Sequence, residues 1–147
     1  MLETHDFLQA DDVAKIEKVA DAVNSGNHTD NEIEKFIGVN SSGRQGRYYR
    51  LAAEKIGLVS LIDINHTVLT DEGEFFCQLN FNDRKGFLTH KIMALPIFSA
   101  AMIYIKTQKP DRQQLLDWFK SCYPGEVSTA ERRFSTFINY LQFCKAI

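Results

Sequence analysis

Apolar residues recur at the 3.6-residue spacing of an α-helix along most of this chain, and short polar or glycine-containing breaks separate the segments. Thr29 and Glu32 have the spacing of a capping box, which marks the start of one helix. One interval differs: the β-branched run 58–64 and its return at 67–69 predict two short strands joined by a turn at 65–66. The expected helices cover residues 10–24, a short segment from Thr29, 42–56, 70–79, 81–107 as one helix bent at Pro96 or as two, 110–123, and 128–143, the last opened by a capping box of Ser128 with Glu131.

The order of these elements predicts a mostly α protein built from two units. In the first unit, residues 1–80, three helices precede a short hairpin, which is the order of a winged helix-turn-helix. In the second unit, residues 81–147, two helices again precede a helix with basic residues at its front, but no second wing can be read. We therefore expect a tandem winged helix-turn-helix with a small β-hairpin wing. We also expect the second unit to be truncated before its wing, in a chain that is a fragment of a longer protein.

The helix expected at 42–56 carries the most specific pattern. Gly57 can end it one residue past Ile56, and either Ser41 or Ser42 can cap its start. On a helical wheel its aromatic and small residues share one face, and its arginines lie on the opposite face or at its edge: Tyr48, Tyr49, Ala52, Ala53 and Ile56 against Gly43, Arg44, Arg47, Arg50 and Glu54. The first turns of the second helix of a helix-turn-helix contact DNA, whereas a charged outer face alone is also typical of a solvated amphipathic helix.

Composition places the chain among ordinary globular proteins, with 44% apolar and 24% charged residues. No apolar run reaches the ~18 residues of a membrane-spanning helix, and the acidic start, residues 1–6, lacks the positive charge of a signal peptide. The three cysteines are odd in number and widely spaced, as expected of buried thiols in a reducing compartment rather than of a disulfide set. We therefore expect a cytoplasmic protein without membrane association.

The net charge of −2 argues against a strongly basic nucleic-acid binder, but charge is unevenly distributed along the chain. Residues 1–40 carry nine acidic against three basic side chains, whereas residues 41–60 carry four basic against one acidic. Residues 128–147 carry three basic against one acidic. Two local basic blocks on an acidic molecule predict weak non-specific affinity for DNA, with binding confined to those blocks.

Candidate catalytic and metal-binding patterns are sparse. A restriction-type nuclease site needs a carboxylate followed by an acid-x-Lys pair that holds Mg²⁺. Asp111 could supply the first carboxylate, but the acid-x-Lys pair, Asp83 with Lys85, precedes it in the sequence. The four histidines are scattered, and no Cys-x-x-Cys spacing or Gly-rich phosphate loop is present. We expect no catalytic residue, no metal site and no cofactor in this chain.

Three segments together resemble a known family. Residues 44–58, which begin Arg-Gln-Gly-Arg-Tyr-Tyr, are followed by Leu-Thr-Asp-Glu-Gly at 69–73. This combination is similar to the first half of a tandem winged-helix module that accompanies type II restriction endonucleases and related defence proteins. Residues 129–136, Thr-Ala-Glu-Arg-Arg-Phe-Ser-Thr, are similar to its second half, and the likeness covers roughly 10–145. The resemblance implies that this chain binds DNA while a separate nuclease domain or subunit cuts it, although the missing second wing departs from the family pattern.

We expect the function to be sequence-specific binding of double-stranded DNA, as the recognition domain of a restriction or defence nuclease. The helices at 42–56 and 128–143 would each enter a major groove. The residues expected to contact bases are Arg44, Arg47, Arg132 and Asn139, and those expected to contact phosphate are Ser41, Ser42, Arg50, Thr129, Arg133 and Thr136. Gln45 leans toward the apolar face but lies in the first turn, from which it can reach a base or a phosphate.

Two other functions fit the same pattern. A free-standing winged-helix transcriptional regulator would use the same DNA-binding residues and would need a dimer interface, for which the apolar helix at 87–105 is a candidate. A winged-helix adaptor between proteins would use the acidic first helix and would not bind DNA. The residues leave the oligomeric state open.

Overall fold

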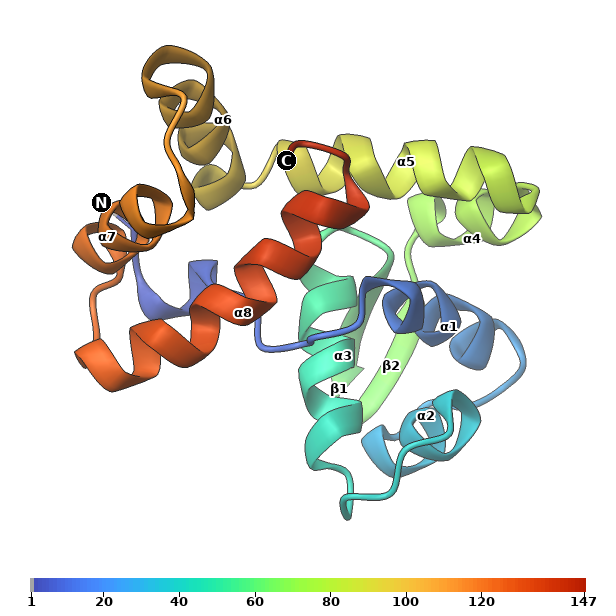
Figure 1. Ribbon diagram of the computed structural model, residues 1–147. Helices are drawn as coiled ribbons and strands as arrows, with labels where there is room; N and C mark the ends of the chain where they lie inside the picture. Colours follow the sequence, from blue (N-terminus) through green and yellow to red (C-terminus); the bar gives the residue numbers. More distant parts are fainter. Residues whose placement is uncertain (1) are drawn as a thin grey trace. The chain divides into compact units, whose positions relative to one another are not determined.

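The computed structural model describes residues 2–147. Within them it contains eight α-helices, one short 3-10 helix and a single two-stranded antiparallel sheet, so the mostly helical class expected from the sequence is confirmed. In chain order the elements are the 3-10 helix Thr4–Asp6, α1 (Val13–Asn24), α2 (Asp30–Ile37), α3 (Arg44–Lys55), β1 (Val59–Asp63), β2 (His66–Leu69), α4 (Asp71–Gln78), α5 (Phe81–Met93), α6 (Pro96–Gln108), α7 (Arg112–Cys122) and α8 (Val127–Phe143) (Figure 1).

The chain divides into two compact units, and the division differs from the expected one after residue 80. We call Asp12–Leu88 the N-terminal unit. The C-terminal unit consists of the residues up to Asp11 together with Thr89–Ile147. Helix α5 runs through the boundary, so the division falls inside a helix rather than in a loop.

The N-terminal segment belongs to the C-terminal unit because it contributes to that unit's core. Phe7 and Ala10 are buried, and the Phe7 ring centroid lies 5.4 Å from that of Phe119 and 4.8 Å from that of Tyr123. The sequence did not indicate this packing, because a lone phenylalanine in an acidic stretch carries no helical periodicity.

Most helices of the N-terminal unit begin where a side chain caps them. The expected capping box is present: the Thr29 hydroxyl accepts from the Glu32 N–H, and the Glu32 carboxylate accepts from the Thr29 N–H. Thr70 caps α4 by accepting from the Gly73 N–H. Helix α3 differs in that its N-cap residue is Gly43, in the left-handed region with φ +89°, although the Ser41 hydroxyl accepts from the Gln45 N–H in its first turn at 2.8 Å. The apolar faces of these elements bury Ile16, Val19, Ile33, Ala53, Ile56, Leu58 and Phe76.

Strands β1 and β2 form an antiparallel hairpin with Val59 opposite Leu69 and Asp63 opposite His66. The register shifts between Leu61 and Asp63, so one extra residue bulges from β1 near the tip. The hairpin follows α3 directly in the chain, and β1 packs against that helix (Figure 1).

The connection between α1 and α2 is bonded to this hairpin. The Thr67 N–H donates to the His28 carbonyl at 2.9 Å, and His28 Nδ1 lies 2.8 Å from the Thr67 carbonyl oxygen. The imidazole rings of His28 and His66 stack with centroids 4.6 Å apart. Strand β2 is therefore held both by β1 and by the segment that precedes α2.

The C-terminal unit is built around aromatic rings from α6, α7 and α8. The Phe137 ring centroid lies 5.4 Å from that of Phe98 and 4.8 Å from that of Phe119. The expected capping box of Ser128 with Glu131 is wrong, because α8 already begins at Val127 and no side chain caps it.

The apolar stretch 81–107 forms two helices, since α5 ends at Met93 and α6 begins at Pro96. Within residues 2–147, no single helix is both long and apolar enough to span a bilayer. Helices α5 and α6 reach that criterion only as a pair, with a bend of 86° between them.

Candidate nucleic-acid interface

A polar hollow opens on the N-terminal unit where the starts of α2 and α3 meet the tip of the hairpin. Arg44 and Arg47 project from the first turns of α3, both are exposed, and neither has an ion-pair partner within residues 2–147. Asp30 is already paired with Arg50, so the two arginines leave the hollow with a net positive charge. The lining residues are Asp30, Asn31, Ser42, Gly43, Arg44, Arg47 and Asn65.

The buried carboxylate of Glu34 lies at the N-terminus of α3. It accepts from the backbone N–H groups of Ser41 at 2.9 Å, Gly43 at 3.1 Å and Gly46 at 3.3 Å, and also from the Ser41 hydroxyl. Burial raises the pKa of the Glu34 carboxyl, but these hydrogen bonds outweigh burial and lower the pKa to about 2. Glu34 therefore fills the anion site that a helix N-terminus offers, so a DNA phosphate cannot bind there.

The polar residues at the start of α3 consequently have different environments. The Ser41 hydroxyl donates to Glu34 and accepts from the Gln45 N–H at 2.8 Å. It is thus committed inside the protein, which corrects the expectation that Ser41 contacts phosphate. Ser42 is exposed, has φ +56° and lines the hollow, whereas the Gln45 side chain is half-buried.

Gly46 allows α2 and α3 to approach closely enough for Glu34 to reach its donors. A Cβ added at Gly46 would lie closer than 3.0 Å to the Asp30 carbonyl oxygen and to the Glu34 Cβ. A larger residue would therefore push α3 away from α2 and move Arg44 and Arg47 with it.

Arg50 is buried and does not lie on the open face of α3. Its Nε donates to Asp30 Oδ1 at 3.0 Å, its Nη2 donates to Asp30 Oδ2 at 3.1 Å, and its Nη1 donates to Glu54 Oε2 at 3.0 Å. Hydrogen bonding to Asp30 raises the pKa of the Arg50 guanidinium. The expectation that Arg50 contacts phosphate is wrong, because α2 covers this side of α3 and supplies the carboxylate.

The tip of the hairpin is fixed to the start of α2. Asn65 has φ +53°, and its Oδ1 accepts from the Asp30 N–H at 2.9 Å. Asp30 thus joins the hairpin through its backbone and α3 through its carboxylate. The three sides of the hollow are held in one arrangement before any ligand binds.

The second predicted DNA-binding face, on α8, is largely occupied by the N-terminal segment. The Thr136 hydroxyl donates to the Asp11 carboxylate, and Asn139 Nδ2 donates to the Asp11 carbonyl at 3.0 Å. Thr136 is also buried. The expected DNA contacts of Thr136 and Asn139 are therefore replaced by contacts within the C-terminal unit.

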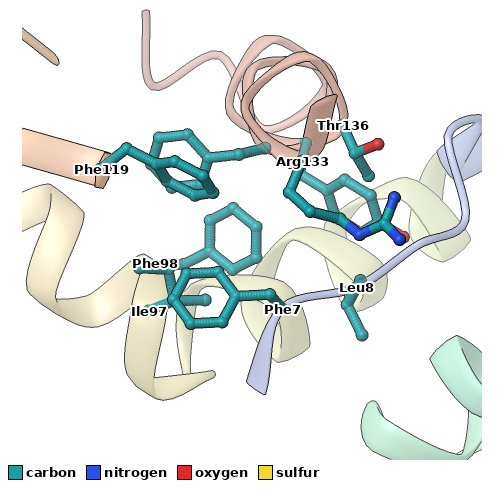
Figure 2. A pocket seen from close by; sticks show the side chains of 9 residues that line it. Phe7, Leu8, Ile97, Phe98, Phe119, Arg133 and Thr136 are labelled. Atoms are coloured by element: carbon teal, nitrogen blue, oxygen red, sulfur yellow. The ribbon is translucent and has the colours of Figure 1, made fainter. Parts of the chain in front are cut away.

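The two arginines of α8 are placed differently. Arg133 is half-buried and lines a cavity of about 10 Å³, beside Thr136 and the segment that carries Phe7 and Leu8 (Figure 2). That cavity has room for about one water molecule and is too small for an organic ligand. Arg132 is exposed, and its Nη2 lies 3.4 Å from the hydroxyl of the half-buried Thr129. Of the two arginines predicted to contact DNA from α8, Arg132 is therefore the exposed one.

Residues 15–146 match a family described as a domain of unknown function, DUF7226. The chain belongs to the DUF7226 family. No curated protein and no solved structure matches the chain. The family match runs through both units and covers the residues of the hairpin, of the hollow and of helices α6 to α8.

The predictions from the sequence did not include two charged residues, Glu34 and Arg84, whose hydrogen bonds join helices of the N-terminal unit of this DUF7226 chain. Arg84 of α5 donates to both carboxylate oxygens of Asp21 and to Glu17 Oε1, and its guanidinium lies 4.9 Å from the Phe76 ring centroid. Hydrogen bonding to Asp21 raises the pKa of Arg84. On α2, Glu34 shares the buried face with Ile33 and Ile37. A carboxylate on a buried helix face needs donors inside the protein, so its position in the sequence indicates that it caps another element.

The carboxylates considered for a nuclease site have other surroundings in the DUF7226 structure. Asp111 Oδ1 accepts from the Gln114 N–H at 2.8 Å as the N-cap of α7, whereas Asp83 is exposed at the start of α5 in the other unit. Among residues 2–147, no three His, Cys, Asp or Glu side chains lie close enough together to hold a metal ion.

Proposed function

We propose that the N-terminal unit is a winged-helix domain that binds double-stranded DNA through the polar hollow. The observation that carries the proposal is the pair of exposed, unpartnered arginines, Arg44 and Arg47, at the start of α3. DNA phosphates or guanine edges would supply the acceptors that these guanidinium groups lack.

The order of elements supports the winged-helix part of the proposal. Helices α1, α2 and α3 precede the hairpin, and the His28 carbonyl accepts from the Thr67 N–H of β2. A helix-turn-helix of this kind presents the N-terminal turns of its second helix, here α3, to the major groove. The hairpin would then act as the wing beside it.

The proposed contacts are fewer than the sequence pattern predicts. Arg44 and Arg47 would read bases or bind phosphate, while Ser42, Asn31 and Asn65 offer uncharged polar groups around them. The C-terminal unit has no strand among its described residues, so we propose it as a helical support in place of a second winged helix.

The resemblance to modules of restriction and defence nucleases is the basis for proposing a role for this DNA binding in the cell. In this proposal the chain recognises the DNA, and a nuclease domain or subunit elsewhere in the enzyme cuts it. Recognition would be sequence-specific, because two arginines in a major groove can each discriminate guanine.

Binding of a labelled mixed-sequence duplex, followed by fluorescence anisotropy at low salt, tests the proposal. The double variant Arg44→Ala with Arg47→Ala should weaken binding, and it should flatten the salt dependence by about one unit for each of the two arginines that neutralises a phosphate. Lys18→Ala, which removes an exposed charge from α1, is the matched control. Absence of binding by the wild-type chain, or equal binding by the double variant, would overturn the proposal. If binding is found, selection from random duplexes, with and without methylation, would define the recognised site.

A protein-binding adaptor is the second candidate, because Phe75 and Phe81 are exposed on α4 and α5. Exposed apolar side chains that form a contiguous patch mark a protein-docking surface, and Phe75 and Phe81 are the candidates for one. A wild-type chain that binds no duplex but whose binding to a partner protein requires Phe75 and Phe81 would favour this function.

A further inference from the structure

The tip of the hairpin exposes apolar side chains where a turn usually has polar ones. Ile64 is 93% exposed, Ile62 is 64% exposed and Leu61 is 40% exposed. Turn positions favour Gly, Asn, Asp and Ser, so a β-branched residue at the tip of a hairpin has no local structural reason. Positions where a sequence breaks a local rule in this way are expected at functional sites.

The tip is also rigidly placed. The Asp63 carboxylate accepts from the Ile64 N–H at 2.7 Å, and the next residue, Asn65, bonds to the start of α2. On the following strand, the His66 ring stacks on His28. Ile64 is therefore displayed by a braced turn, which lowers the entropy cost of burying it in a partner.

The position of the tip indicates which partner it meets. Asn65, adjacent to Ile64 in the chain, lines the same hollow as Arg44 and Arg47. A duplex bound in the hollow would continue past it, and the hairpin tip would then lie beside the groove next to the bound one. The apolar tip adjoins a cationic site through Asn65, which favours DNA over a protein as its occupant.

We propose that Ile64 is a wedge that enters the minor groove and partly unstacks one base step, with Ile62 adding apolar contact beside it. Apolar side chains that insert between base pairs kink the duplex and favour steps that unstack easily. This inference rests on the proposed DNA binding and adds to it a preference for deformable DNA.

A mismatched duplex tests the wedge without knowledge of the recognised sequence. Unstacking costs least at a mismatched pair, so the wild-type chain should bind a duplex with one central mismatch more tightly than its fully paired parent. Burial of one isoleucine corresponds to about a tenfold change in affinity. Ile64→Ala should abolish that preference and reduce bending measured by energy transfer between the duplex ends.

The control variant is Ile103→Ala, which removes the same side chain at a 67% exposed position on α6. Equal bending and equal mismatch preference in Ile64→Ala and the wild type would overturn the wedge while leaving DNA binding intact. A wild-type chain that binds neither duplex would overturn the proposed function and the wedge together. Loss of a protein partner by Ile64→Ala, with DNA bending unchanged, would assign the tip to protein recognition instead.

Discussion

Arg50 and Asp30 are joined at two points, from Nε to Oδ1 at 3.0 Å and from Nη2 to Oδ2 at 3.1 Å. The backbone N–H of the same Asp30 donates to Asn65 at the tip of the hairpin. A single residue thus ties together α2, α3 and the hairpin, which are the three walls of the hollow. Arg50 acts on this site by positioning it, whereas Arg44 and Arg47 face the space where DNA would bind.

Replacing Arg50 by Ala should therefore lower the free energy of unfolding rather than act directly on binding. The change leaves the half-buried Asp30 carboxylate without its partner, and breaking a buried ion pair costs about 3 kcal/mol. Urea unfolding followed by circular dichroism measures the loss. Arg47→Ala, which removes an exposed guanidinium from the same helix, should change stability by less than about 0.5 kcal/mol.

Equal stability of Arg50→Ala and the wild type would contradict this assignment. If Arg50→Ala kept the stability of the wild type and lost affinity for a duplex as strongly as Arg47→Ala does, Arg50 would be a direct DNA contact.

Glu34 gives the N-terminal unit a specific dependence on pH. Its folded-state pKa of about 2 lies below the ordinary value of 4.5. The carboxylate therefore stabilises the fold fully above pH 4.5, and this contribution is lost as the pH falls from 4.5 toward 2. Glu34→Gln should lower stability at neutral pH by about 2 kcal/mol, because an amide group then faces backbone donors.

The control for this effect is Glu74→Gln, which alters an exposed carboxylate on α4. Unfolding measured in urea at neutral pH, at pH 4.5 and near pH 3 should show a smaller loss of stability on acidification in Glu34→Gln than in the wild type or the control. Parallel curves for all three proteins would show that Glu34 is not the group responsible.

The positions of most helices could be predicted because their caps and periodicity are local. Thr29 with Glu32 and Thr70 each specify a helix start within four residues of sequence. The burial of Arg50 depends instead on which side of α3 is covered by α2. Gly46 lies one turn before Arg50 on that side, so the glycine was a readable sign that another helix passes closely there.

The face of α8 could not be predicted by the same reasoning. Thr136 and Asn139 have the spacing of an exposed polar stripe, yet their partner is Asp11, more than a hundred residues away in sequence. A wheel projection treats a polar stripe as solvated, because it contains no information about distant segments that supply matching donors and acceptors. Long-range polar pairing of this kind is visible only in the folded chain.

The purified chain alone should not cut DNA. Asp111 is committed to the α7 cap, and no three candidate ligands for a metal ion cluster within residues 2–147. Supercoiled plasmid incubated with the protein and Mg²⁺ or Mn²⁺ should therefore stay supercoiled. Nicking that persists through purification and disappears in Asp83→Ala or Asp111→Ala would assign a nuclease site to the chain.

The contribution of α8 can be separated from that of α3 by salt dependence. Each phosphate neutralised contributes about −0.9 to the slope of log affinity against log salt. Because Thr136 and Asn139 bond to Asp11 and Arg133 is half-buried beside the N-terminal segment, Arg132 is the one predicted arginine of α8 that is left exposed for a phosphate contact. Arg132→Ala with Arg133→Ala should thus flatten the slope by at most about one unit.

The matched comparison is Arg44→Ala with Arg47→Ala, which removes the same number of charges from α3 and should flatten the slope by up to about two units, one for each arginine that neutralises a phosphate. Thermal unfolding of both double variants checks that neither loses its fold. A slope that flattens equally in the α8 variant would mean that both units touch one duplex, as the tandem hypothesis requires, and that the contact of Asp11 with α8 opens when DNA binds.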